Sequence, residues 1–309
     1  MIKSVGTAFL LLFVSLSSYA CDICGSGSGG GGSYMGLWPS FKKRFIGLRF
    51  QQNGLRDHLG PGGSITYLTT KETYRVAEVW GAINFGQRFR VAAFVPYNFI
   101  ERKNQEGTTS RNGIGDVSVS GYYRLLNHQQ AVGTKLLEQN LWIGAGFKLP
   151  TGQYNKEEKN IEQAGQNTFQ LGTGSADFSA HLMYDIKLGK AGLNVNSSYK
   201  INNYNQADYR YGNKFTLNSL FYYQAVKTSK LVVSPNTGLL YETSQKDHNT
   251  RELEVFATGG YSLMGTVGTE LAVGNIGIGA NYQHPLSQQL GEGKVRALDR
   301  CMVYVSYSF

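Results

Sequence analysis

Apolar and polar side chains alternate with a period of two along most of the chain after Trp38 and Pro39, and this pattern predicts β-strands. The clearest case is residues 177–187, where Phe178, Ala180 and Leu182 alternate with polar neighbours. The same alternation predicts strands near residues 44–53, 73–85, 88–99, 116–125, 141–149, 193–202, 215–224, 231–242, 262–273, 276–283 and 301–309. No long window shows a helical period, so we expect an all-β protein of about 12 strands.

The last predicted strand ends on an aromatic residue. Its odd-numbered positions, Cys301, Val303, Val305, Tyr307 and Phe309, fall on one face. In an exported bacterial protein, the aromatic girdle of an outer-membrane barrel offers an apolar environment for such an end. The ending also resembles the signal that barrel-assembly machinery recognises, so Val305, Tyr307 and Phe309 are the predicted assembly signal. The alternative is the final strand of a soluble β-sandwich.

The predicted connections alternate in length, which is an independent indication of the fold. Short connections fall at residues 86–87, 188–191, 226–230 and 274–275, and a longer one at 127–140 fits this set less well. The other set, at 54–72, 103–112, 151–175, 204–213, 244–254 and 285–299, is longer and more polar. Short periplasmic turns and long external loops are typical of outer-membrane barrels. We therefore expect a transmembrane antiparallel up-and-down β-barrel of about 12 strands.

The amino-terminal residues predict export. Residues 1–20 resemble a signal peptide, with Lys3, an apolar stretch at 8–16 and small residues before the cut at Ala20. Cys21 after the cut suggests a lipoprotein, but Ser18 stands where Leu is usual, which favours ordinary cleavage. Residues 21–40 are then a periplasmic segment with a Gly/Ser linker, and residues 41–309 form the barrel in a Gram-negative outer membrane.

Composition and charge narrow the partners. The chain has 20 Tyr, 16 Phe, 39 Gly and only 6 Pro, which suits strands, tight turns and aromatic belts. A net charge of +9 would suggest nucleic-acid binding in a cytosolic protein, but the export signal argues against nucleic acid as a partner. Basic residues in loops can instead face anionic lipid headgroups or sugars. The expected partners are outer-membrane lipid, the barrel-assembly machinery and a small solute, and the barrel is expected to be monomeric.

The polar face of the predicted strands must face the lumen, because a charge facing lipid costs roughly 2–4 kcal/mol at mid-bilayer. These charges either line a solute path or hold the lumen together through ion pairs and water. Large inward side chains such as Trp80, Trp142 and Tyr222 are expected to fill part of a narrow lumen. The lumen-lining candidates are Arg49, Glu78, Arg90, Asp116, Arg124, Lys148, His181, Asp185, Lys187, Lys200 and Glu270.

Three side chains are candidates for a chemical role. His181 is expected beside Asp185 as a hydrogen-bonded lumen residue rather than a ligand or base. His284 falls on the outward face near the external rim, where an outer-membrane phospholipase carries its His and Ser, but spacing alone places no Ser and acid beside it. Cys301 is expected as a buried, inert thiol. There is no phosphate-binding loop, zinc-protease His pair or nucleic-acid motif.

Cys21 and Cys24 form an exported CxxC segment at the start of the mature chain. It is a candidate metal-binding or thiol-exchange handle, because thiolates favour copper(I) or zinc. A disulfide or an anchor to a partner is the simpler interpretation, since two ligands rarely hold a metal. No cofactor is predicted.

Short motifs within the predicted barrel carry a family resemblance. They read Val-Pro-Tyr at 95–97, Gly-Ile-Gly-Asp-Val at 113–117, Tyr-Tyr-Arg-Leu at 122–125, Phe-Lys-Leu-Pro-Thr-Gly at 147–152 and Ser-Ala-Asp at 175–177. With them the chain resembles transporter-like outer-membrane barrels related to those encoded alongside meta-pathway phenol-degradation enzymes. The resemblance implies uptake or passage of small, hydrophobic or aromatic solutes.

The amino-terminal segment is similar to a Bacteroidetes-type branch of these barrels. The carrying residues are Cys-Asp-Ile-Cys-Gly at 21–25, Tyr-Met-Gly-Leu at 34–37 and Lys-Arg-Phe-Ile-Gly-Leu at 43–48. In that branch another Cys often follows the Gly, and Ser26 stands there in this chain, which weakens an inherited metal site.

Three classes of function follow from the sequence. The first is passive passage of a small solute, with lumen charges selecting and outer loops gating. The second is a non-transporting barrel platform whose Cys21 and Cys24 engage a periplasmic metal or redox partner. The third, an enzyme, requires Ser, His and an acid to converge on one face, and the sequence does not favour it.

Overall fold

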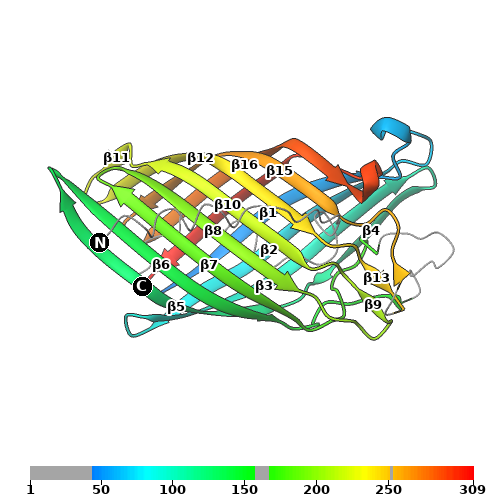
Figure 1. The fold of residues 1–309 in the computed structure, drawn as a ribbon, viewed down its shortest axis with the longest axis horizontal. Helices are drawn as coiled ribbons and strands as arrows, with labels where there is room; N and C mark the ends of the chain where they lie inside the picture. The colour runs from blue at the N-terminus through cyan, green and yellow to red at the C-terminus, as the bar shows by residue number, and fades with distance from the viewer. Residues whose placement is uncertain (1–43, 157–166, 251–252) are drawn as a thin grey trace, which may run out of the picture.

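The computed structural model describes residues 44–156, 167–250 and 253–309, and these form a closed antiparallel β-barrel of 12 strands (Figure 1). Pairing of the first barrel strand with the last closes the barrel, in a register that runs from Phe45 opposite Ser308 to Gln52 opposite Cys301. The barrel strands are β1 (Phe45–Asp57), β2 (Thr70–Phe85), β3 (Phe89–Asn104), β5 (Ser118–Val132), β6 (Lys135–Lys148), β7 (Asp177–Leu188), β8 (Ala191–Ile201), β10 (Lys214–Tyr223), β12 (Leu231–Ser244), β15 (Gly260–Val273), β16 (Ile276–Leu290) and β18 (Arg300–Ser308). The predicted fold class is confirmed.

The structure also contains short strands and 3-10 turns in addition to the 12 barrel strands. β4 (Gly107–Ile114) pairs with the outer part of β3, and after a break at residues 115–117 β5 pairs with the rest of that strand. β9 (Tyr209–Arg210), β13 (His248–Asn249) and β14 (Leu253–Glu254) form a separate small sheet. The others are β11 (Val226–Lys227), β17 (Arg296–Ala297) and the 3-10 turns η1 (Pro61–Gly63) and η3 (Gly291–Gly293).

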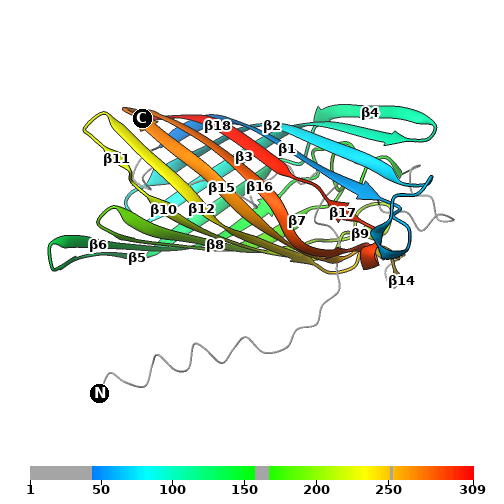
Figure 2. The ribbon, with the colours of Figure 1, turned by 90° about the horizontal axis from the view of Figure 1, so that it is seen from above.

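The connections sort by length between the two ends of the barrel (Figures 1 and 2). Short turns lie at the end that carries the carboxyl terminus, and the long loops with the small sheet lie at the other. This end with long loops is the extracellular end, because outer-membrane barrels place short turns in the periplasm. The predicted long periplasmic connection at 127–140 is wrong. β5 and β6 continue there and meet in a tight turn at Gly133, whose φ is 57°.

Most side chains that point away from the barrel axis are apolar and exposed. Leu48 is 60% exposed and Val79 45%, at successive strands of the outer wall. Such a continuous apolar surface needs lipid around it. Cys301 lies on this outward face and is exposed, so its predicted burial is wrong. Within the described residues, no helix is long and apolar enough to cross a membrane.

Candidate functional site

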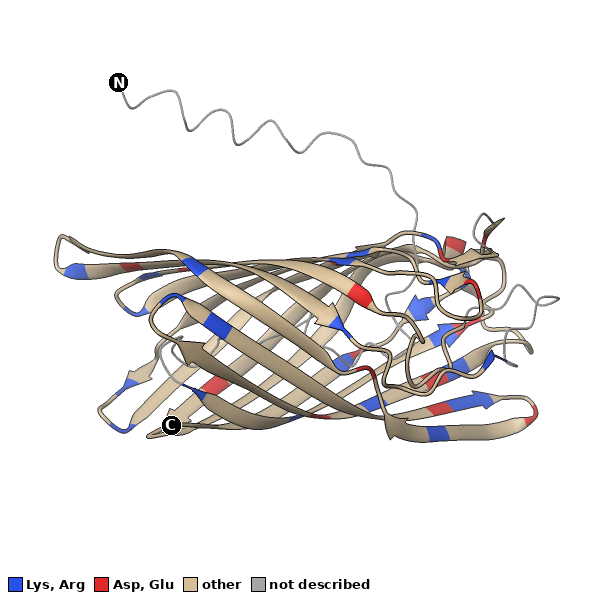
Figure 3. Cartoon of the chain, turned by 90° about the horizontal axis from the view of Figure 1, so that it is seen from below, with Lys and Arg blue, Asp and Glu red and all other residues tan. Residues whose placement is uncertain are grey.

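The inward face of the barrel divides into two zones along its axis. The periplasmic half carries large aromatic side chains, here called the aromatic zone: Phe45, Trp80, Phe94, Tyr122, Trp142, Tyr222 and Tyr304. The extracellular half carries buried charges in ion-pair networks, here called the charged zone. Figure 3 shows the charged residues crowding toward the extracellular end, with a smaller set at the periplasmic turns.

Rings of the aromatic zone contact one another across neighbouring strands. Trp80 is at the centre of this contact set, with its ring edge-on to Phe45 at a centroid distance of 4.7 Å and edge-on to Tyr304 at 5.8 Å. It also stacks with Phe94 at 6.4 Å. These are the separations and orientations that aromatic pairs prefer. These four rings therefore form a continuous aromatic wall along strands β1, β2, β3 and β18.

Several tyrosine rings of the aromatic zone lie over a glycine of the next strand. A Cβ added at Gly279 would lie 2.2 Å from the ring of Tyr304, and one at Gly192 would lie 2.2 Å from the ring of Tyr222. Each glycine is directly opposite its tyrosine in the strand register. Because glycine has no side chain, the ring can lie against the barrel wall instead of projecting toward the axis.

Arginines accompany these rings. Arg49 forms an ion pair with Glu78, and its guanidinium carbon lies 5.4 Å from the centroid of Trp80. The guanidinium carbon of Arg90 lies 5.3 Å from the Phe45 ring, and that of Arg124 lies 5.4 Å from Trp142. Cation–π contacts of this kind stabilise a desolvated guanidinium. Four predicted lumen residues, Arg49, Glu78, Arg90 and Arg124, thus belong to the aromatic zone.

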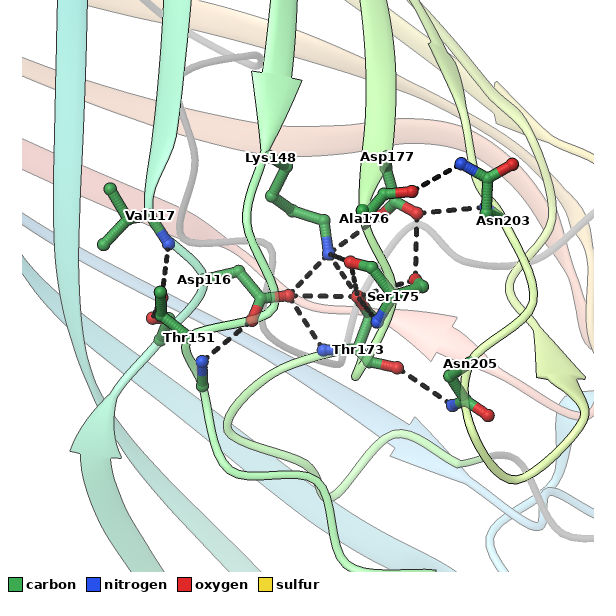
Figure 4. A network of polar contacts seen from close by, with 12 residues as sticks. Asp116, Val117, Lys148, Thr151, Thr173, Ser175, Ala176, Asp177, Asn203 and Asn205 are labelled. Carbon is green, nitrogen blue, oxygen red and sulfur yellow. Dashed lines mark hydrogen bonds and ion pairs between the residues drawn. The ribbon is translucent and has the colours of Figure 1, made fainter.

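The principal network of the charged zone is built around Lys148 (Figure 4). Its Nζ lies 2.5 Å from Oδ2 of Asp116 and 2.8 Å from Oδ2 of Asp177, and all three side chains are buried. Nζ of Lys200 lies 3.6 Å from the same Asp177 oxygen. Buried charges of this kind persist only when they are paired and hydrogen-bonded. Strands β6, β7 and β8 and the break before β5 therefore meet at this point.

Asp116 occupies the break between β4 and β5 and uses it to hold the loop that follows β6. Its carboxylate accepts backbone N–H bonds from Gly152 at 3.0 Å and Thr173 at 2.9 Å (Figure 4). Thr151 Oγ1 in turn accepts the N–H of Val117 at 2.9 Å. Backbone groups that the break leaves without a ladder partner are thus satisfied by the loop.

The last part of that loop, residues 167–175, folds inward at the extracellular mouth. Phe169 is 2% exposed and lies between two guanidinium groups, 4.4 Å from Arg102 and 5.0 Å from Arg111. Asn98 Nδ2 donates to the carbonyl of Leu171 at 2.8 Å. The segment is therefore bound to strands β3 and β4 of the wall, inside the mouth.

The charged zone also contains charges that are not among the predicted lumen residues. Glu242 is fully buried between Lys214 at 2.9 Å and Arg300 at 2.6 Å. Glu72 is 1% exposed and pairs with Arg102 at 2.6 Å. Each of these residues has the inward parity of its strand. The period-two alternation that indicates the other lumen charges therefore indicates these as well.

The remaining predicted lumen residues have separate partners. His181 Nε2 lies 2.9 Å from Oγ of Ser179, whereas Asp185 accepts from Tyr222 and from Nδ2 of Asn194 at 3.2 Å. His181 and Asp185 therefore belong to different contacts. Lys187 pairs with Glu138 at 2.7 Å near the periplasmic end. Glu270 lies on β15 opposite Ser234.

His284 lies next to an acidic side chain. Its Nδ1 lies 2.7 Å from Oδ1 of Asp299, on the exposed outer surface near the extracellular rim. Hydrogen bonds from Tyr282 and His284 hold the pKa of Asp299 below its usual value. Across residues 44–156, 167–250 and 253–309, no serine hydrogen-bonds to this imidazole.

The amino-terminal cysteines are the predicted metal ligands. In the part of the chain that the structure describes, no group of three or more His, Cys, Asp or Glu side chains could hold a metal ion. Cys21 and Cys24 lie outside the described residues, so metal binding there stays a prediction.

A closed barrel with an apolar outer wall and charged lumen defines an outer-membrane β-barrel protein. The chain belongs to the family described as the putative MetA-pathway of phenol degradation, whose model matches residues 49–291. The predicted Bacteroidetes-type branch stays a prediction. No curated protein matches the sequence significantly.

Solved structures share the fold. The COG4313 outer membrane channel from Pseudomonas putida F1 is 12% identical, with 96% of this chain and 100% of that one covered and a TM-score of 0.61. The β domain of the Bordetella autotransporter BrkA is also 12% identical, with 86% and 100% covered and a TM-score of 0.51. At these identities the likeness concerns the fold alone.

Proposed function

We propose that this barrel is a passive outer-membrane channel for small aromatic solutes. The observation that carries the proposal is the aromatic zone, because the interior of a water-filled porin is polar. A wall of rings centred on Trp80 offers an aromatic solute the same stacked and edge-on contacts that the rings make with one another. The family description, which names phenol degradation, and the fold shared with a solved outer-membrane channel support this assignment.

The two zones have different roles in this proposal. The charged zone at the extracellular mouth admits solutes together with water and, through residues 167–175, narrows the entrance. Trp80, Phe94 and Arg49 are 2%, 1% and 8% exposed, so in this proposal the rings part and the solute replaces their contacts with one another, which makes its binding weak. Conduction requires binding that is favourable enough for entry and weak enough for release.

Single-channel recording on the full chain in planar bilayers tests the proposal. We expect small discrete conductance steps, interrupted by phenol more often than by cyclohexanol, which has a similar size but no ring electrons. Substitution of Trp80→Leu should remove this preference, since leucine keeps apolar bulk without the aromatic face. A folded barrel that neither conducts nor distinguishes the two alcohols would sink the proposal.

A further inference from the structure

Four basic residues form a continuous row across the outer wall at the extracellular rim. Arg56 on β1 is directly opposite Arg296 on β17 and, on its other side, Lys71 on β2. Lys71 in turn is directly opposite Lys103 on β3. Neighbouring strands lie about 4.8 Å apart, so four positive charges share a row about 15 Å long.

All four residues point outward. On β1, Arg56 has the parity of the exposed residues Leu48 and Phe50, and on β3, Lys103 has the parity of the exposed Phe99. Lys103 lies four residues beyond Phe99, which is about 13 Å along the strand. The row therefore lies just outside the apolar belt, at the level where lipid headgroups meet the protein.

No carboxylate of the described residues neutralises the row. Glu101, an outward carboxylate on β3, instead lies 3.7 Å from Arg75, one outward position closer to the membrane. Among the residues that the structure describes, no carboxylate forms an ion pair with any member of the row. Like charges directly opposite each other destabilise a pair of strands. An external anion would remove this repulsion.

The loop that precedes Lys71 adds exposed apolar groups beside the row. Ile65 is 66% exposed, Tyr67 80% and Leu68 68%, immediately before β2 begins. Exposed apolar and aromatic side chains next to cations are typical of surfaces that lie against a membrane interface.

We propose that this row, Arg56, Lys71, Lys103 and Arg296, binds the phosphate groups of the glycolipid in the outer leaflet. Phosphates fit the row because they carry the opposite charge and accept hydrogen bonds from both guanidinium and ammonium groups. The proposal depends on the outer-membrane location and not on the passage of any solute. Each basic residue near an anionic lipid surface contributes to affinity, so the whole row should strengthen binding by about tenfold or more.

Binding of lipid A to the refolded full chain in detergent micelles tests the proposal. We compare lipid A that bears both phosphates with the same lipid after dephosphorylation, using fluorescently labelled lipid, and expect at least about tenfold tighter binding of the phosphorylated form. The combined variant Arg56→Gln, Lys71→Gln, Lys103→Gln and Arg296→Gln should lose this preference. If that variant does not fold, as judged by heat-modifiable gel mobility, the two paired variants Arg56→Gln/Lys71→Gln and Lys103→Gln/Arg296→Gln are used instead.

A matched control removes the same charge from the other end. Lys135, Lys190, Lys227 and Lys230 are exposed at periplasmic turns, so their combined substitution by Gln should leave the preference unchanged. An equal loss in the control variant, or equal binding of both lipids by the unmodified protein, would overturn the proposal. Displacement of the lipid by equimolar inorganic phosphate would also overturn it, by identifying a site for free phosphate.

Discussion

The smallest features with a functional consequence are the glycines beneath the tyrosine rings. We predict that Gly279→Ala narrows the lumen without destabilising the barrel. The new Cβ would lie 2.2 Å from Cε1 of Tyr304, so the ring must swing away from the wall. Alanine in a strand is favoured over glycine by about 0.5–1 kcal/mol, which offsets part of the strain. Single-channel conductance should fall, while the free energy of unfolding in urea changes by less than about 1 kcal/mol.

Gly121 supplies the control for this prediction. It lies on the outward face of β5, and a Cβ added there meets no heavy atom within 4 Å. Gly121→Ala should therefore leave conductance unchanged. Equal conductance in both variants would contradict the view that the tyrosine rings lie against the wall because glycine makes room for them.

At the scale of single elements, the break between β4 and β5 matters because it holds the inward loop. We predict that Asp116→Asn loosens residues 167–175. The amide can keep an oxygen for the Thr173 N–H but loses the negative charge that attracts Lys148, and its NH2 group then faces the Gly152 N–H and cannot accept it. The loss should cost about 1–3 kcal/mol of folding free energy. Hydrogen–deuterium exchange should become faster at residues 167–175.

Glu138→Gln is the comparison for Asp116→Asn. It also removes an inward carboxylate, but its partner Lys187 lies near the periplasmic end, far from the loop. Exchange in residues 167–175 should therefore be unaffected. Faster exchange in both variants would mean that general destabilisation, rather than the bonds of Asp116, controls the loop.

The strands can be predicted from the sequence, whereas the contacts of the break at residues 115–117 cannot. Strand positions and the inward or outward side of each residue follow from local alternation, so the sequence predicts the strands and the inward side of Arg49. The break at 115–117 continues an alternating pattern, and its carboxylate bonds to Thr173, 57 residues away. Contacts at such separations depend on which loop folds inward, and period-two alternation carries no information about that.

At the scale of the whole molecule, the pairing of β1 with β18 closes the barrel. A substitution at the end of β18 can affect assembly of the barrel without affecting its stability. The side chain of Phe309 is 61% exposed on the outer surface, and only its backbone is bound, through an N–H bond to the Arg44 carbonyl at 2.9 Å. We predict that Phe309→Ser lowers the amount of folded barrel in the outer membrane severalfold. Its effect on the folded barrel in detergent should stay within about 0.5 kcal/mol, as for other surface substitutions.

This prediction is tested by comparing the amount of folded barrel in cells with the stability of the refolded barrel in detergent. Phe221 is 51% exposed on the same outward surface near the periplasmic end of β10, so Phe221→Ser removes a similar lipid contact without changing the carboxyl end. Heat-modifiable gel mobility of isolated outer membranes measures the folded barrel in each variant, and urea titration of refolded protein measures stability. If the terminal strand is read by assembly machinery, only Phe309→Ser depletes the membrane. Equal depletion by both variants would instead assign the effect to lost lipid contact, because the two phenylalanines differ in position along the chain and hardly in exposure.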